Sequence, residues 1–73
     1  MTYRKFSPID RIEPIFEFTI DGEAIFDVSY NDAGICEVAF HSAIVGVVME
    51  EKKFRELIET GIILAESEKS RSY

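Results

Sequence analysis

Two side chains in this sequence could form a nucleophile–base pair, the thiol of Cys36 and the imidazole of His41. They belong to the single cysteine and the single histidine among the 73 residues. Such a pair works when its two groups lie within hydrogen-bond reach and a third group orients the base. Both residues fall on one predicted strand, five positions apart, so their side chains point to opposite faces of the sheet. We therefore expect a buried, unreactive thiol and no enzymatic activity.

Other residue patterns that carry chemistry are missing from the sequence. One cysteine and one histidine cannot supply the three or four nitrogen and sulfur ligands of an ordinary zinc site, and one cysteine cannot form an internal disulfide. There is no glycine-rich phosphate loop and no nucleophile elbow. Paired carboxylates are plentiful, but a chain with 14 acidic residues supplies them by chance. We expect neither a metal nor another cofactor.

Composition and charge narrow the class of protein. Hydrophobic residues make up 47% of the chain and only two prolines occur, which is typical of a folded domain. The net charge of −6 argues against direct binding of nucleic acid, because that binding needs a basic surface. No apolar run is long enough to span a membrane, and the first residues lack the apolar core of a signal peptide. We expect a cytoplasmic protein without a membrane partner.

The charge is unevenly distributed along what we interpret as a single domain, residues 1–73. Residues 1–11 carry three basic residues against one acidic residue, whereas the remainder carries five basic residues against thirteen acidic ones. This first segment contains Ser7-Pro8 and shows no periodicity, so we interpret it as an irregular basic arm. It is either a loose terminus or an arm that folds back on the acidic residues or contacts a partner.

Residues 12–41 have the pattern of a three-stranded antiparallel meander. Apolar side chains alternate with other residues through 12–20, 24–30 and 35–41, as in strands that are buried on one face. Turn residues separate the three stretches. The pattern places a row of large apolar side chains on one face of the sheet: Phe16, Phe18, Phe26, Val28, Val38 and Phe40.

The second hairpin of the meander is defined by the stretch YNDAGICEV, from Tyr30 to Val38. A three-residue loop, residues 32–34, joins its strands, and Gly34 occupies the position at which such loops need a positive φ. A slip by one residue would move Glu37 to the core face. Turn chemistry and apolar pattern therefore predict one register, with Tyr30 opposite Cys36, Val28 opposite Val38 and Phe26 opposite Phe40.

The first hairpin allows two registers. Asp21-Gly22 suits a two-residue turn, but that register would place Asp27 opposite Phe16, among the core residues. A three-residue loop, residues 20–22, would place Phe26 opposite Phe16 instead. We prefer the second register, because burying a lone carboxylate costs several kcal/mol. A bulge in one strand would reconcile the two.

The C-terminal half of the chain predicts a helix. Residues 42–49 are apolar without alternation, so they form either a loop or a short fourth strand. Residues 50–69 have the spacing of an amphipathic helix, and Gly61 lies on its apolar stripe. A glycine there costs about 1 kcal/mol relative to alanine, which predicts a close approach to the sheet. The stripe comprises Phe54, Leu57, Ile58, Ile62 and Ala65.

These elements predict an α+β fold. An antiparallel meander of three strands, or of four if residues 42–49 pair with it, packs on one C-terminal helix. The helix covers the face that carries the phenylalanines. A chain of this length buries only about 60% of the surface of its unfolded form, so association with a partner subunit would add useful stability.

The opposite face of the sheet is our candidate for binding a partner protein. It combines acidic residues with isoleucines, which is either an ordinary solvated face or a binding patch with an apolar centre and a negative rim. Such a patch would suit a basic partner protein. The predicted partner-binding residues are Glu13, Ile15, Glu17, Ile25, Asp27, Ile35 and Glu37.

A second candidate surface is apolar. The chain has more apolar residues than one layer of sheet and helix can hide, and Ile63 points away from the helix stripe. A fourth strand would cover some of them, and a homodimer would bury them. The predicted oligomer contacts are Ile44, Val45, Val47, Ile63 and Leu64.

The sequence therefore supports two functions. The size, charge and layout are similar in general style to those of small acidic immunity, antitoxin and anti-defence proteins of bacteria and phages. That resemblance implies an inhibitor that docks its acidic sheet face on a basic partner protein. The alternative is a structural or regulatory homodimer without a catalytic role, in which the acidic residues only provide solubility.

Overall fold

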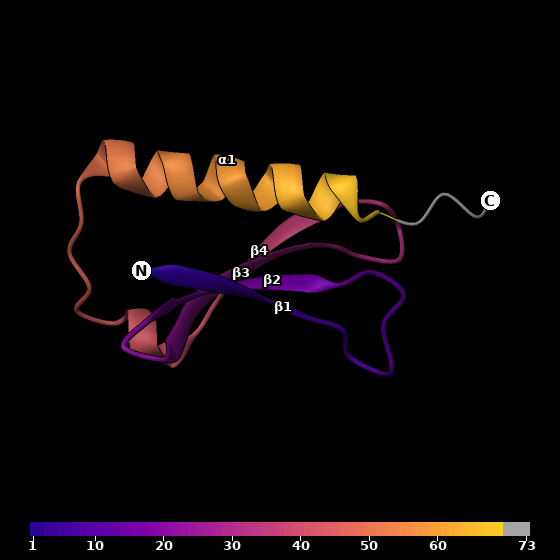
Figure 1. Ribbon diagram of the computed structural model, residues 1–73, viewed down its shortest axis with the longest axis horizontal. Helices are drawn as coiled ribbons and strands as arrows, with labels where there is room; N and C mark the ends of the chain where they lie inside the picture. The colour runs from indigo at the N-terminus through magenta and orange to yellow at the C-terminus, as the bar shows by residue number, and fades with distance from the viewer. Residues whose placement is uncertain (70–73) are drawn as a thin grey trace.

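The computed structural model describes residues 1–69 and shows one four-stranded antiparallel sheet with a helix on one side (Figure 1). The predicted α+β class, with an antiparallel sheet packed on one C-terminal helix, is confirmed. The strands follow one another across the sheet in chain order. The elements are β1 (Thr2–Phe6), β2 (Ile15–Ile20), β3 (Glu23–Tyr30), β4 (Cys36–Phe40), the short 3-10 helix η1 (Ser42–Ile44) and α1 (Glu51–Ser67).

The fourth strand comes from the N-terminus, where an irregular arm was predicted for residues 1–11. That prediction is wrong, because β1 pairs antiparallel with β2 along its whole length and Arg4 lies opposite Glu17. One arginine and one lysine interrupt the apolar alternation of this strand, and both side chains fold back on acidic residues. Arg4 Nε lies 2.8 Å from Glu17 Oε1, and Lys5 Nζ lies 2.6 Å from Glu68 Oε1 at the end of α1.

Residues 42–49 form a loop that contains η1, the first of the two predicted alternatives. Gly46, at φ +83°, bends the chain between η1 and α1. Several side chains of this segment are half-buried and pack against the core, among them Ala43, Ile44, Val47 and Met49. Within residues 1–69, no strand pairs with the outer side of β4, so β1 and β4 are the two edges of the sheet.

The second hairpin has the predicted loop and register. Asn31 N–H donates to the Ile35 carbonyl at 2.9 Å, Gly34 N–H donates to the Asn31 carbonyl at 2.9 Å, and Gly34 has φ +80°. The Asn31 side-chain oxygen also accepts hydrogen bonds from the N–H groups of Ala33 and Ile35. The strands then pair as predicted, with Val28 opposite Val38 and Phe26 opposite Phe40.

The first hairpin has the two-residue turn, so the preferred three-residue loop is wrong. Asp21 and Gly22 both have positive φ, 52° and 81°, as a type I′ turn requires. The register shifts between Phe18 and Thr19, and this bulge leaves Ile25 as the extra residue of β3. Because of the shift, Phe18 lies opposite Phe26, and the carboxylate of Asp27 stays out of the core.

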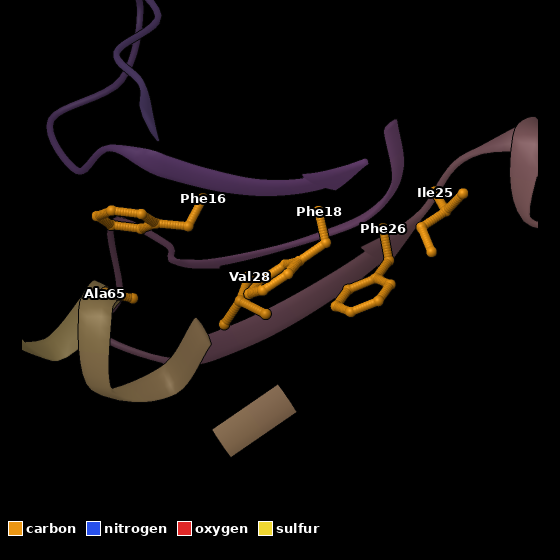
Figure 2. Packing of buried hydrophobic residues seen from close by; sticks show 6 residues of the cluster. All are labelled: Phe16, Phe18, Ile25, Phe26, Val28 and Ala65. Carbon is orange, nitrogen blue, oxygen red and sulfur yellow. The ribbon is translucent and has the colours of Figure 1, made fainter. Parts of the chain in front are cut away.

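The core lies between the sheet and α1. Phe18 and Phe26 stack with their ring centroids 4.9 Å apart, and Phe54 of α1 meets the Phe26 ring edge-on at 5.5 Å. Gly61 lets the helix approach closely, because an added Cβ would lie 2.6 Å from Val28 Cγ2. Figure 2 shows the buried core residues, with Ile25 set apart from Phe16, Phe18, Phe26, Val28 and Ala65.

Candidate functional site

The predicted partner-binding residues do not form one exposed acidic face. Three of them are buried, namely Glu13, Ile25 and Asp27, with 5%, 1% and 7% of their surface exposed. Ile25 was expected to be a surface anchor, but the bulge turns it into a core residue. Ile15 and Glu17 are half-buried, and only Ile35 and Glu37 are exposed.

A row of charged side chains crosses the face of the sheet that lies away from α1. Glu17 of β2 lies opposite Asp27 of β3, which by itself would be a repulsive pair. Arg4 holds Glu17 at 2.8 Å from one side, and His41 Nε2 lies 2.8 Å from Asp27 Oδ2 on the other side. We call these four residues the charge row. Its carboxylates already have partners within the chain.

The loop between β1 and β2 lies on the side of the sheet away from α1 (Figure 1) and contacts part of this face through Arg11. The guanidinium of Arg11 donates from Nη2 to Ser29 Oγ at 3.1 Å and to the Tyr30 carbonyl at 3.2 Å. Ser29 is consequently 3% exposed. Loop and charge row together leave little of this face free for an acidic docking surface.

The structure places Cys36 and His41 on opposite faces, as their spacing predicted. His41 bonds to Asp27 within the charge row, whereas Cys36 lies opposite Tyr30 on the side of α1. Burial raises the pKa of the Cys36 thiol, and the nearby carboxylates of Glu66 and Glu37 raise it further. The thiol is half-buried rather than fully buried, and at neutral pH it is protonated and a poor nucleophile.

A polar hollow of about 500 Å³ lies beside the charge row, lined by Arg4, Glu17, Glu23, His41 and Ser42 among others. Its walls carry both signs of charge. Among the described residues, no group of three or more His, Cys, Asp or Glu side chains is placed to hold a metal ion.

On the helix side of the sheet, β4 is only partly covered. The helix packs chiefly on β3 and, to a smaller extent, on β2. A helix about 10 Å wide covers roughly two strands spaced about 4.8 Å apart. Val38 and Phe40 share the core face but remain 36% and 63% exposed. The expectation that α1 would cover both of them is therefore wrong.

The segment before α1 also exposes apolar side chains. Val45 and Val48 are 84% and 94% exposed. A hollow of about 390 Å³ nearby is lined by Phe54, by Glu51 and by apolar residues of that segment. Phe54, on the wall of this hollow, contacts Phe26, and Phe26 lies opposite Phe40 of β4. We call this surface the apolar edge: Val38, Phe40, Val45, Val48 and the hollow.

The predicted oligomer contacts do not lie on one surface. Val45 belongs to the apolar edge, and Ile44 and Val47, which are half-buried and pack on the core, line the hollow of that edge. Ile63 is 68% exposed, but at 100° per residue it points away from the sheet, opposite the side that carries Gly61. Leu64 is half-buried beside the core. Ile63 is therefore an isolated surface residue and not part of a patch.

The backbone of β4 is also open at its outer side. Ile35 accepts a bond from Asn31, and His41 N–H donates to the Ile25 carbonyl at 2.9 Å, so both residues direct their backbone groups toward β3. In an antiparallel strand this direction alternates. The N–H and C=O groups of Cys36, Val38 and Phe40 therefore point outward, away from the sheet.

Sequence reasoning missed Val38 and Phe40 as surface residues because their pattern is that of a core strand. A signal was present: β4 is the last strand of a meander, and one helix is too narrow to cover its face. No protein-family model, curated protein or solved structure matches this chain. Within residues 1–69, no helix combines the length and the apolar character needed to cross a membrane.

Proposed function

We propose that this chain is a small, non-catalytic protein-binding module that binds another polypeptide through the apolar edge. The observation that carries the proposal is the combination, on one strand, of exposed Val38 and Phe40 with an outward row of backbone donors and acceptors. Exposed apolar patches mark interaction sites, and a free sheet edge binds a further strand by main-chain hydrogen bonds.

The asymmetry between the two edges of the sheet supports the same surface. Edge strands that do not bind partners are often protected by charged side chains, bulges or proline. β1 carries Arg4 and Lys5, both engaged in ion pairs. β4 carries one charged residue, Glu37, and no bulge or proline. It therefore has less protection against strand addition.

Electrostatic docking of an acidic sheet face, as in an inhibitor of a basic protein, has less support. Glu17 and Asp27 are held by Arg4 and His41, so the face offers few free carboxylates to steer a partner. In this proposal the net charge of −6 serves solubility.

The test is recovery of bound protein from source cells with the wild-type chain, a Phe40→Ser variant and an Ile63→Ser control. The two substituted residues have similar exposure, 63% and 68%, so the pair compares the apolar edge with an isolated apolar residue. We expect binding to survive high salt, to be lost in Phe40→Ser and to persist in Ile63→Ser.

Amide hydrogen exchange on the purified complex then locates the binding surface on the chain. The outward amides of Val38 and Phe40 should exchange more slowly in the complex than in the free chain. Binding that Phe40→Ser leaves intact, or that rising salt releases, contradicts the proposal and favours the electrostatic alternative.

A further inference from the structure

The apolar edge has features that indicate which polypeptide occupies it. We propose that a second copy of this chain binds there, by antiparallel pairing of β4 with β4 about a two-fold axis at Ala39. This inference rests on the proposed function and names its partner. The product is a dimer with one continuous eight-stranded sheet.

The directions of the backbone groups of β4 suit this pairing. The outward N–H and C=O groups of Val38 in one copy meet those of Phe40 in the other, and the symmetric pair repeats the match. Two copies therefore form four main-chain hydrogen bonds across the axis. Ala39 and its symmetry mate form a pair without direct hydrogen bonds at the axis, where strands approach most closely.

The side chains of β4 favour a two-fold axis at Ala39 over the other symmetric axes. An axis at Glu37 would set two like charges directly opposite each other, which is unfavourable. An axis at Val38 would leave Glu37 opposite an alanine. With the axis at Ala39, each Glu37 lies opposite His41 of the other copy, and each Phe40 lies opposite Val38. The polar positions and the apolar positions are then both self-complementary, and no two like charges lie opposite each other.

The small side chain at the axis fits the close approach. Ala39 is exposed and lies on the face away from α1, so two copies can bring their strands together there without displacing a bulky group. The apolar row formed by Val38 and Phe40 from both copies lies on the helix side. It shields from water the two large apolar side chains of β4 that are exposed in the single chain.

The opposite edge of the sheet limits the assembly to two copies. β1 carries Arg4 and Lys5, and in the dimer both outer edges are β1 strands. Charged edges of this kind disfavour further strand addition. The interface uses the same patch on both copies, so the assembly closes and does not extend into a fibre.

The first experiment measures the mass of the wild-type chain by light scattering over a concentration series. We expect twice 8.4 kDa, with mass falling toward the single chain on dilution. Phe40→Ser should raise the dissociation constant at least roughly tenfold, and Ile63→Ser should leave it unchanged. Far-ultraviolet circular dichroism verifies that each variant is folded.

Single-cysteine crosslinking then tests the axis. In a Cys36→Ser background, Ala39→Cys places two thiols opposite each other at a distance that a disulfide can span. Glu37→Cys and Val38→Cys are matched controls, because each would pair with itself only about a different axis. Under mild oxidation we expect about tenfold more crosslinked dimer from Ala39→Cys than from either control.

The outcomes separate this inference from the function on which it rests. A dimer that crosslinks through position 37 or 38, and not through Ala39, overturns the proposed axis. A wild-type chain that stays monomeric at every concentration, yet binds another protein that Phe40→Ser releases, overturns the second copy and leaves the binding function intact. A monomer that binds nothing overturns both.

Discussion

Alanine in place of Gly61 should destabilise the fold, although alanine is the better helix former. At an exposed helix position the change would contribute about 1 kcal/mol of stability. Here the added Cβ would lie 2.6 Å from Val28 Cγ2 and 3.0 Å from Phe18 Cε2. These two neighbours are 0% and 1% exposed, so they have no free space into which to move.

The magnitude follows from the two opposing effects. Forcing a methyl group into a filled core typically costs about 1–3 kcal/mol, and the tight contacts favour the upper half of that range. Subtracting the gain in helix propensity leaves a net loss of about 1–2 kcal/mol. For a chain of this length each kcal/mol lowers the melting temperature by about 4–8 °C. Denaturant and thermal unfolding at one fixed protein concentration measure both quantities.

A matched control and a second substitution separate the effect of packing from that of helix propensity. At exposed Ile63, the Ile63→Ala variant should be more stable than Ile63→Gly by about 1 kcal/mol, the opposite sign to that at position 61. In a Val28→Ala background, Gly61→Ala should cost at least about 1 kcal/mol less than in the wild type. If Gly61→Ala stabilises the wild-type chain, or if the two substitutions are additive, the close packing of α1 on β3 is refuted.

Three further predictions concern local interactions. Asn31→Ala removes two side-chain hydrogen bonds from the second hairpin and should lower the free energy of unfolding by about 1–2 kcal/mol. Asn31→Asp retains the acceptor and should lower it less. Urea unfolding compares the two variants, and equal losses would contradict the role of the Asn31 side chain as acceptor. Arg4→Ala should lower the free energy of unfolding by up to about 1 kcal/mol. The loss should be smaller in high salt, and it should vanish in a Glu17→Gln background. The pKa of Cys36 lies above its ordinary 9.0 in the folded chain. Its contribution to the free energy of unfolding is therefore fully present below pH 9.0 and is lost as the pH rises through the folded pKa. Cys36→Ser should flatten this alkaline decline, and Glu66→Gln should move the midpoint of thiol reactivity back toward 9.0; an unchanged midpoint would disprove the contribution of Glu66.

The second hairpin and the helix were predictable because their signals are local. Gly34, Asn31 and the apolar alternation around them all specify one register, and the structure has that register. The helix stripe and the close approach at Gly61 likewise follow from spacing alone. Where turn chemistry and apolar pattern agree, the sequence is sufficient to predict the local structure.

The first hairpin and β1 were not predictable, because non-local contacts decide them. Asp21-Gly22 and the phenylalanine pattern demand different registers, and the bulge at Ile25 satisfies both. β1 has two charged residues among five and shows no apolar stripe. Its pairing with β2 brings Arg4 and Lys5 to acidic partners far along the chain, and that information is absent from the local pattern.

The candidate site shows the same limit. Sequence pattern placed Phe40 correctly on the core face, but the width of the helix determines which strands of that face are covered. The acidic face was inferred from alternation alone, which does not reveal that Arg4 and His41 bond to its carboxylates. An edge strand can be recognised only once the strand order is known.

The position of α1 at the end of the fold also affects how the chain reaches its native state. Synthesis completes all four strands before the residues that cover Phe18 and Phe26 exist, and Ala65 is among the last of the core residues to be made. An uncovered sheet with open edges is prone to bind other nascent chains. The charges of β1 and the acidic character of the chain keep such early encounters weak until the helix docks.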